Sequence, residues 1–169
     1  MICVVSDTHG TDGHRLVGRT LEAVREADAV IHAGDFTTAA VLDAFEAESR
    51  KLHAVCGNNA TPAVRERLPK ERTVEFEGIR IALTHGDDRD ETALSLFGRQ
   101  EGANLVVFGH SHRPEFVDTG EIALLNPGSH AEPRWYRPAH AELDVRDGHI
   151  DGKLRTPNGN VFEEFRIQA

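Results

Sequence analysis

Short apolar runs alternate with amphipathic segments over the first two thirds of the chain. The runs, each typical of a buried strand, lie at residues 2–5, 29–33, 52–56 and 105–108. The segments between them, which place apolar side chains on one helical face, lie at about 13–27, 38–48, 62–68 and 90–102. Two further runs, 73–76 and 79–83, predict a hairpin around Glu77 and Gly78. This alternation favours βα units that form a parallel sheet.

Beyond residue 112 the pattern changes to short strands separated by turns. The expected strands lie at 115–118, 121–125, 139–145, 149–154 and 161–167. In the third of them Ala141, Leu143 and Val145 alternate with Glu142 and Asp144, which is typical of an antiparallel strand with one solvent-exposed face. We therefore expect one α/β domain over residues 1–169, in which two packed sheets are accompanied by helices.

Length and composition narrow the class of protein. A chain of 169 residues is long enough for one domain with a substantial core. No apolar run is long enough to span a bilayer, and no basic region precedes an apolar stretch at the N-terminus, which favours a cytoplasmic protein with no membrane partner. The formal net charge of −9 disfavours a nucleic-acid-binding patch. Cys3 and Cys56 both fall in expected buried strands, which predicts free, packed thiols rather than a disulfide.

Polar side chains that can bind metals follow the expected strands. Asp7 and His9 come directly after the first strand, and in an extended chain this spacing points both side chains to the same side. Later strands are followed by Asp35, by Asn58, by His85, and by the pair His110 and His112. Any one of these is equally well explained as a polar loop at a strand end. Together they place seven donors at the carboxyl edge of an α/β sheet, where such folds bind ligands. Seven donors suit two divalent ions that share a bridging carboxylate better than one structural zinc ion.

The order of these motifs resembles a known family. The series D-x-H, G-D, G-N, H-G and G-H-x-H runs from Asp7 to His112, and it is similar to that of the calcineurin-like metallophosphoesterase superfamily. The spacing looks like that of the small single-domain phosphodiesterases of bacteria and archaea, as does the stretch from Leu125 to Ser129 with the Pro-Arg pair after it. The resemblance implies a four-layer α-β-β-α fold, in which two packed mixed β-sheets are flanked by helices. It also implies a metal-dependent phosphoesterase, most of all a phosphodiesterase.

The resemblance further implies a set of metal ligands. Asp7, His9 and His112 would hold the first ion. Asn58, His85 and His110 would hold the second ion, and Asp35 would bridge both. Two divalent ions are expected, Mn²⁺ first and Ni²⁺, Fe²⁺, Co²⁺, Zn²⁺ or Mg²⁺ as alternatives, because oxygen and imidazole donors do not choose among them. A hydroxide between the ions would attack phosphorus in line, with Asp35 and Asn58 as catalytic residues and Asn58 also binding a substrate oxygen.

One departure from the superfamily bears on the substrate. Many members read G-N-H-[D/E] where this chain reads Gly57-Asn58-Asn59-Ala60, so the histidine that acts as general acid is absent. General acid catalysis contributes roughly 10²–10⁴-fold to the rate. We therefore expect poor hydrolysis of alkyl phosphomonoesters and better hydrolysis of phosphodiesters or of esters with good leaving groups. Asn59 and Arg134 are expected to contact a small phosphate-ester substrate, although a solvated position also explains either residue.

The remaining histidines and the aromatic pair have structural explanations as well. We expect strand packing for His32 and His53, and a surface position for His14, His140 and His149. His130 follows the stretch that ends in Ser129, so it either borders the site or packs elsewhere. Trp135 and Tyr136 cap the cleft, form a subunit contact or pack in the ordinary way.

Two alternatives to a phosphodiesterase stay open. One is a phosphomonoesterase that acts on nucleotides or phosphoproteins, against which the missing histidine counts. The other is a non-enzymatic scaffold or binding protein on the same fold, such as the metallophosphoesterase-like subunit of retromer. Such proteins tend to lose metal ligands, whereas all seven positions here carry a competent side chain. The resemblance also implies a homodimer or higher homo-oligomer.

Overall fold

A computed structural model describes residues 1–168 and places the first strand in the middle of a six-stranded sheet. The strand order in this sheet is β11-β10-β9-β1-β2-β3. The first three strands, which run parallel, are β1 (Ile2–Val5), β2 (Ala29–His32) and β3 (Leu52–Ala54). The other three form an antiparallel extension and are β9 (His140–Arg146), β10 (His149–Arg155) and β11 (Val161–Gln168).

The second sheet has five strands in the order β4-β5-β6-β8-β7. Its strands are β4 (Glu71–Phe76), β5 (Ile79–Thr84), β6 (Leu105–Val107), β7 (Pro114–Asp118) and β8 (Ala123–Pro127). The three central strands β5, β6 and β8 are parallel, and the edge strands β4 and β7 pair antiparallel to their neighbours. Both sheets are therefore mixed, and the predicted hairpin around Glu77 and Gly78 is confirmed.

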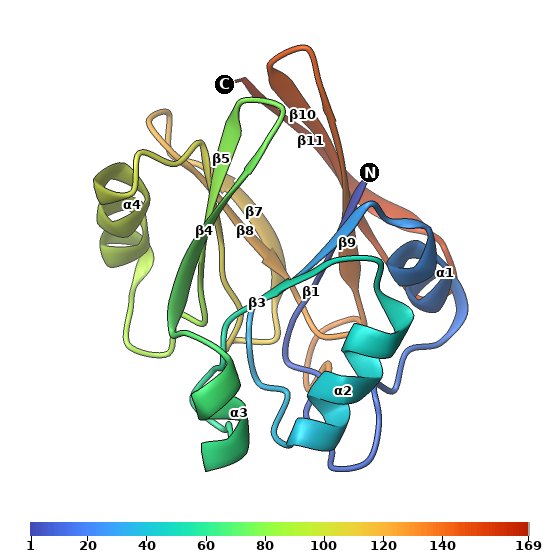
Figure 1. Ribbon diagram of the computed structural model, residues 1–169. Helices are drawn as coiled ribbons and strands as arrows, with labels where there is room; N and C mark the ends of the chain where they lie inside the picture. Colours follow the sequence, from blue (N-terminus) through green and yellow to red (C-terminus); the bar gives the residue numbers. More distant parts are fainter. Residues whose placement is uncertain (169) are drawn as a thin grey trace.

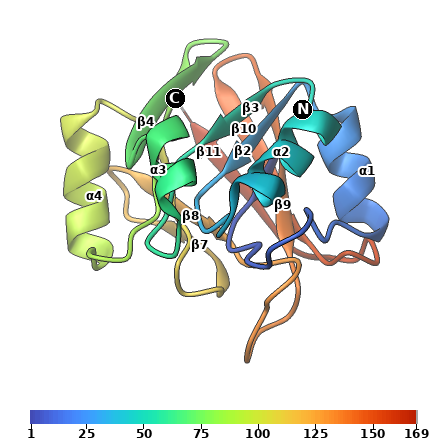
Figure 2. The same ribbon diagram turned by 60° about the horizontal axis from the view of Figure 1, so that its bottom comes forward.

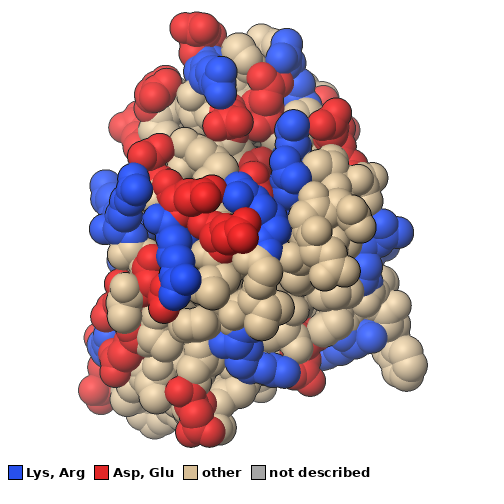
Figure 3. Space-filling view, turned by 90° about the vertical axis from the view of Figure 1, so that its right-hand side faces the viewer, with Lys and Arg blue, Asp and Glu red and all other residues tan. Residues whose placement is uncertain are grey.

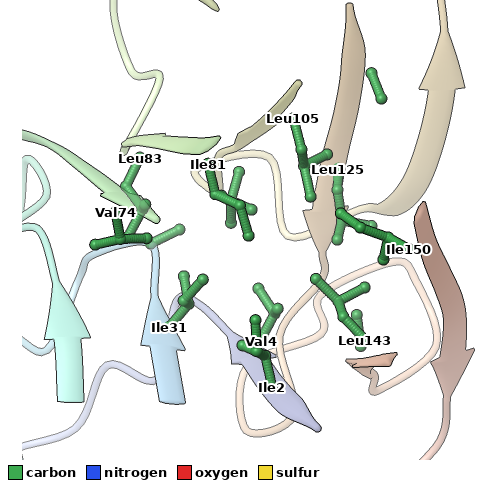
Figure 4. Packing of buried hydrophobic residues seen from close by; sticks show 14 of the residues in the cluster. Ile2, Val4, Ile31, Val74, Ile81, Leu83, Leu105, Leu125, Leu143 and Ile150 are labelled. Atoms are coloured by element: carbon green, nitrogen blue, oxygen red, sulfur yellow. The ribbon is translucent and has the colours of Figure 1, made fainter. Parts of the chain in front are cut away.

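The alternation of side chains along the central strands builds three apolar layers. In β1, Ile2 and Val4 point into the core between the two sheets, whereas Cys3 and Val5 point to the opposite face. Figure 4 shows the inner layer, in which Ile31 and Val4 face Ile81 and Leu105 of the other sheet. Because both faces of the parallel strands are covered, these strands read as continuous apolar runs in the sequence.

Helices cover the outer face of each sheet (Figure 1). The six-stranded sheet is covered by α1 (Gly18–Glu26) and α2 (Ala39–Glu48), and the five-stranded sheet by α4 (Glu91–Gln100). The short α3 (Pro62–Arg67) packs at the end of the molecule next to α2. The result is the predicted four-layer α-β-β-α sandwich. No helix within residues 1–168 is both long enough and apolar enough to cross a membrane.

The first helix begins later than its amphipathic pattern predicts. The pattern indicated a start at about residue 13, but α1 begins at Gly18. Arg15 adopts a left-handed φ of 55°, and the backbone N–H of Leu16 donates to Nδ1 of His14, so the chain turns before it becomes helical. The guanidinium of Arg15 donates instead to the carbonyl oxygen of Thr8, at 3.2 Å. Leu16 is nevertheless buried, which explains why the pattern extended too far.

Two expectations about the antiparallel strand β9 were wrong. Glu142 and His140 were expected to face solvent, but both are buried because α1 covers this part of the sheet. Arg19 of α1 donates to both carboxylate oxygens of Glu142, at 2.8 and 3.1 Å, and Thr20 hydrogen-bonds Nδ1 of His140 at 2.9 Å. The exposed face that carries α1 mixes acidic and basic side chains, so its charge is not gathered in one patch (Figure 3).

Candidate metal centre

The predicted ligands lie on loops at one end of the molecule. The chain leaves β1, β2 and β3 at the lower edge of Figure 1, and Figure 2 turns this edge towards the viewer. Two overlapping groups of carboxylate and imidazole side chains form there. One contains Asp7, His9 and His112, and the other contains Asp7, Asp35 and His85. The structure therefore brings together five of the seven predicted ligands, from positions up to 105 residues apart in the chain.

The first group has the spacing of ligands around one ion. Nε2 of His9 lies 3.2 Å from Nε2 of His112, and Nε2 of His112 lies 3.5 Å from Oδ1 of Asp7. Two donors that each bind a metal at roughly 2.1 Å in neighbouring coordination positions are themselves roughly 3 Å apart. The two distances are close to this spacing, so the three side chains suit a cation.

The second group joins the first through the two carboxylates. Oδ2 of Asp35 lies 3.3 Å from Nε2 of His85 and 3.6 Å from Nε2 of His9. Nε2 of His85 also lies 3.9 Å from Oδ1 of Asp7. Asp35 is therefore placed between a ligand of one group and a ligand of the other, as a bridging carboxylate must be.

Backbone carbonyl groups set the orientation of two of the imidazoles. Nδ1 of His85 donates to the carbonyl oxygen of Ala33 at 2.7 Å, and Nδ1 of His112 donates to the carbonyl oxygen of Glu132. A proton on Nδ1 leaves Nε2 with a free lone pair, which is the form that binds metals. Nε2 of His85 is buried and has no hydrogen-bond partner among residues 1–168. A buried nitrogen with a free lone pair, 3.3 and 3.9 Å from two carboxylate oxygens, is suited to bind a metal ion.

The ligands sit on unusual backbone. Five of the seven predicted ligands have left-handed φ angles: Asp7 (53°), His9 (51°), Asp35 (63°), His110 (67°) and His112 (61°). Left-handed φ is uncommon outside glycine, and each instance costs on the order of 1 kcal/mol or more. The chain is thus not extended between Asp7 and His9, as the spacing argument assumed. The tight turns, and not strand alternation, direct both side chains into the same site.

Two glycines allow the loops to approach each other. A Cβ on Gly57 would lie 2.3 Å from the backbone nitrogen of Asp35, and a Cβ on Gly109 would lie 2.0 Å from Oγ of Ser6 and 2.7 Å from Oδ2 of Asp7. No real Cβ makes contacts this short. Glycine is therefore required at both positions for close packing, and not only for turn formation.

The two carboxylates differ in their electrostatic setting. Burial raises the pKa of Asp7 to about 6. Burial also acts to raise the pKa of Asp35, but His85 and two hydrogen bonds from Asn59 outweigh it and hold that pKa well below its usual value. Burial lowers the pKa of both His9 and His112, which favours the neutral imidazole that binds metals.

The two remaining predicted ligands lie at the rim. His110 is exposed and belongs to neither group; its backbone N–H donates to both oxygens of Asp7, at 3.2 and 3.0 Å, and its ring lies edge-on to that of His85. Asn58 is also exposed, and its carbonyl oxygen accepts from Arg65 at 2.7 Å. Its side chain lines a cleft of about 250 Å³ together with His85. Both residues therefore lie next to His85, at the exposed side of the five grouped side chains.

Asn59 contacts Asp35, which the sequence analysis did not predict. Its backbone N–H donates to Oδ1 of Asp35 at 2.9 Å, and its side-chain amide donates to Oδ2 at 2.8 Å. Both carboxylate oxygens of the predicted bridge are therefore held by this one residue. Asn59 thus orients Asp35, a role that could not be recognised from the sequence because an asparagine in a turn has many equivalent explanations.

Residues of the 126–132 segment support the site from behind and were not assigned a role from the sequence. Asn126 donates to the carbonyl oxygen of Gly109 at 2.8 Å and to Oγ of Ser111 at 3.0 Å. Ser129 donates to the carbonyl oxygen of Asp7 at 2.7 Å. These bonds fix the loops that carry Asp7 and His110. The family resemblance of the stretch was the only sequence signal for them.

Of the other residues discussed in the sequence analysis, Arg134 is exposed, whereas His32 and His130 are buried. The charge of Arg134 adds to burial in lowering the pKa of His9 and His112. His32 packs in the core against Phe36, as expected. His130 is buried against Phe45, behind the site.

A four-layer sandwich that gathers carboxylates and imidazoles at the carboxyl ends of its strands defines a class of metal-dependent phosphoesterases. The chain belongs to the calcineurin-like phosphoesterase superfamily: the model of that superfamily domain matches residues 1–148.

Known proteins agree with this assignment. The chain is 34% identical to the "Probable metallophosphoesterase MJ0623" of Methanocaldococcus jannaschii, over 91% of this chain and 80% of that protein. It is 25% identical to "Phosphodiesterase MJ0936" of the same organism, over 75% and 82%. Among solved structures, a predicted phosphoesterase from Streptococcus pneumoniae is 26% identical with a TM-score of 0.75, covering 98% and 96% of the two chains. The Zn-bound Vps29 of Entamoeba histolytica, at 22% identity, covers 99% and 98% with a TM-score of 0.79 and shows the shared fold.

Proposed function

We propose that this protein is a dinuclear metal-dependent phosphodiesterase. The observation that carries the proposal is the pair of overlapping ligand groups, in which Asp35 lies between His9 and His85 at 3.6 and 3.3 Å. Two divalent ions bound there would supply an ionised water as nucleophile and positive charge for the phosphoryl oxygens. Mn²⁺ is our first candidate for both positions, since the oxygen and imidazole donors do not exclude it.

The chain's own residues orient this centre. His85 and His112 are held in the metal-binding tautomer by the carbonyl groups of Ala33 and Glu132. Asn59 fixes the carboxylate of Asp35 through both oxygens. Asn58 and His110 would complete the ligand set on the exposed side, where a substrate enters. Arg134 would attract the phosphate anion, which is consistent with the effect of its positive charge on the pKa of His9 and His112.

The preference for diesters rests on what position 59 cannot do. An alkyl monoester needs a proton delivered to its leaving oxygen, and many superfamily members carry histidine at this position. The backbone N–H and the side-chain amide of Asn59 both donate to Asp35, and an amide has no proton to transfer at neutral pH. The curated relative named a phosphodiesterase, at 25% identity, supports the same choice.

Elemental analysis and one matched pair of variants test the proposal. Asp35→Asn removes the charge of the predicted bridge but keeps a side chain that tolerates left-handed backbone. Asp147→Asn is the control, because Asp147 has a left-handed φ of 48° in an exposed turn far along the chain from the site. We expect the purified protein to contain two divalent ions and to hydrolyse bis(p-nitrophenyl) phosphate faster than alkyl phosphomonoesters. Asp35→Asn should lose metal and hydrolysis together, and Asp147→Asn should lose neither.

The same measurements separate the alternatives. A monoesterase rate above the diesterase rate would contradict the substrate preference. A folded protein that binds no divalent ion and hydrolyses neither ester class would contradict the enzyme itself and favour a scaffold on this fold.

A further inference from the structure

His32, the last residue of β2, is fully buried. Its ring stacks on that of Phe36 with 3.7 Å between the ring centres, and it meets the ring of Phe45 edge-on at 4.8 Å. A leucine or phenylalanine could fill such an apolar space without burying a polar atom. What distinguishes His32 from these residues is its two ring nitrogens.

Both ring nitrogens of His32 make hydrogen bonds in the interior. Nδ1 accepts from the backbone N–H of Gly34 at 3.1 Å, and Nε2 lies 2.9 Å from Oγ1 of Thr8. Burial lowers the pKa of His32 well below its usual value, so the ring is neutral. Because Nδ1 is the acceptor, the proton of the neutral ring is on Nε2, which donates to Thr8. The two bonds therefore fix both the orientation and the tautomer of this imidazole.

The two partners of this imidazole lie on the loops that carry three of the grouped metal ligands. Thr8 stands between Asp7 and His9, and Gly34 directly precedes Asp35. The backbones of these loops are also paired. The N–H of Asp7 donates to the carbonyl oxygen of Gly34 at 3.0 Å, and the N–H of His9 donates to that of Asp35 at 2.9 Å. The imidazole adds a side-chain link to the same junction, in the interior, where water cannot replace a lost hydrogen bond.

This link bears on metal binding because Asp7, His9 and Asp35 all have left-handed φ angles. Such conformations persist only where the surrounding structure enforces them. If the two loops moved apart, Oδ2 of Asp35 and Nε2 of His9, which are 3.6 Å apart, would lose the spacing of ligands around an ion. The position of these donor atoms therefore depends on what joins the loops.

We infer that His32 is a positioning residue for the metal centre. It holds the loop that follows β1 against the loop that follows β2, and it thereby raises the affinity for the first ion. His32 binds no ion itself and acts only through Thr8 and Gly34. The inference rests on the metal centre of the proposed function, and it does not depend on which ester the protein hydrolyses.

Three substitutions separate the two hydrogen bonds of His32. His32→Leu removes both nitrogens but keeps an apolar side chain. His32→Asn keeps an acceptor oxygen near the position of Nδ1, and His32→Gln keeps an amide nitrogen near the position of Nε2. In calorimetric titration of the whole chain with Mn²⁺, His32→Leu should weaken binding of the first ion by about 10-fold or more, and each amide variant should recover part of this loss. An unchanged affinity in His32→Leu, or no recovery in either amide variant, would overturn the inference.

The hydroxyl partner of His32 provides a milder test with a matched control. Thr8→Val removes the acceptor with little change of shape. Thr20→Val is the control, because Thr20 is also fully buried and its Oγ1 also lies 2.9 Å from a ring nitrogen of a buried histidine, His140. Both variants should lose stability in denaturant unfolding of the metal-free protein, whereas only Thr8→Val should weaken Mn²⁺ binding, by about 5-fold. In His32→Asn, which already lacks this bond, Thr8→Val should change the affinity little further. Equal weakening in the two valine variants would reduce the effect to a general loss of stability and contradict the positioning role.

These results separate the inference from the proposed function. If the unmodified protein binds Mn²⁺ and His32→Leu binds it equally well, the inference is wrong and the phosphodiesterase stands. If His32→Leu weakens binding but the unmodified protein hydrolyses neither ester class, the inference stands and the phosphodiesterase is wrong. If the unmodified protein binds no divalent ion, both are wrong.

Discussion

Two parts of the candidate metal centre differ in how firmly the protein holds them. Asp7, Asp35, His85 and His112 are buried, and each is fixed by a hydrogen bond or a close contact within the site. Asn58 and His110, the other ligands implied for the second ion, are exposed and contribute only backbone contacts or an edge-on ring. Folding therefore orients most of the ligands implied for the first ion. Of the ligands implied for the second ion, it orients Asp35 and His85 but leaves Asn58 and His110 exposed.

This difference predicts unequal binding of the two ions. A site whose ligands are already oriented loses little conformational entropy when the ion binds, whereas the rim residues must still be ordered. We expect a tight first ion and a weaker second ion. The variants below change one side of the comparison at a time, beginning with the largest expected effect.

Replacement of Asp7 should remove both ions, because Asp7 belongs to both ligand groups. Asp7→Asn keeps the shape and tolerates the left-handed backbone, so the fold should persist. We expect loss of bound metal by elemental analysis and a roughly thousand-fold or greater fall in kcat/KM for a phosphodiester. A variant that retains one tightly bound ion would show that the two groups are independent.

Replacement of a rim ligand should affect one ion only. His110→Ala leaves the backbone N–H that donates to Asp7, and so it tests the side chain alone. Calorimetric titration with Mn²⁺ should show an unchanged tight step and a weakened second step, with activity lower by roughly 10- to 100-fold. Weakening of both steps would place His110 in the first group.

Removal of the support for Asp35 should have a smaller effect than removal of a ligand. Asn59→Ala deletes the side-chain bond to Oδ2 but leaves the backbone bond to Oδ1. We expect metal affinity to fall about 10-fold, measured by calorimetry. Asn158→Ala, in an exposed turn, is the matched control and should bind metal like the unmodified protein. Equal affinity in the two variants would deny Asn59 its positioning role.

The buried ion pair under α1 gives a prediction that leaves the metal centre unchanged. Burial acts to raise the pKa of Glu142, but His140 and Arg19 outweigh it and lower that pKa to about 2. The folded protein thus holds this proton less tightly than the unfolded chain does. The stabilisation from the pair is present above pH 4.5 and is lost as the pH falls towards 2. Glu142→Gln should lower the free energy of unfolding by on the order of 3 kcal/mol near neutral pH. Measured by denaturant unfolding, the stability of the variant should depend less on pH between 4.5 and 2. Metal binding should be unchanged.

The sequence predicts the elements well where apolar periodicity is strong. The buried strands and the cap at Asp90 were located, because β1 and β2 are covered on both faces and because Asp90 accepts from the N–H of Ala93. The start of α1 was missed because Arg15 makes a turn for reasons that lie in Thr8 and Glu132, far from it in the chain.

The candidate metal centre was likewise predictable only in part. The predicted identity of the ligands depended on residue type and order, which the sequence contains. How they are held depends on contacts between distant loops, such as Ser129 with Asp7 and Asn59 with Asp35, which no local pattern encodes. The burial of His140 was missed for the same reason, since only the placement of α1 over β9 covers it.

The left-handed conformations of Asp7, His9, Asp35, His110 and His112 have a consequence for the way this protein can change. Glycine or asparagine would relax the backbone at each of these positions, so substitutions that ruin the chemistry are among those that favour folding. Selection for heat resistance alone would therefore erode the reactive loops first and leave the sandwich intact. A thermostable descendant obtained in that way should be screened for its ions before its melting temperature is taken as an improvement.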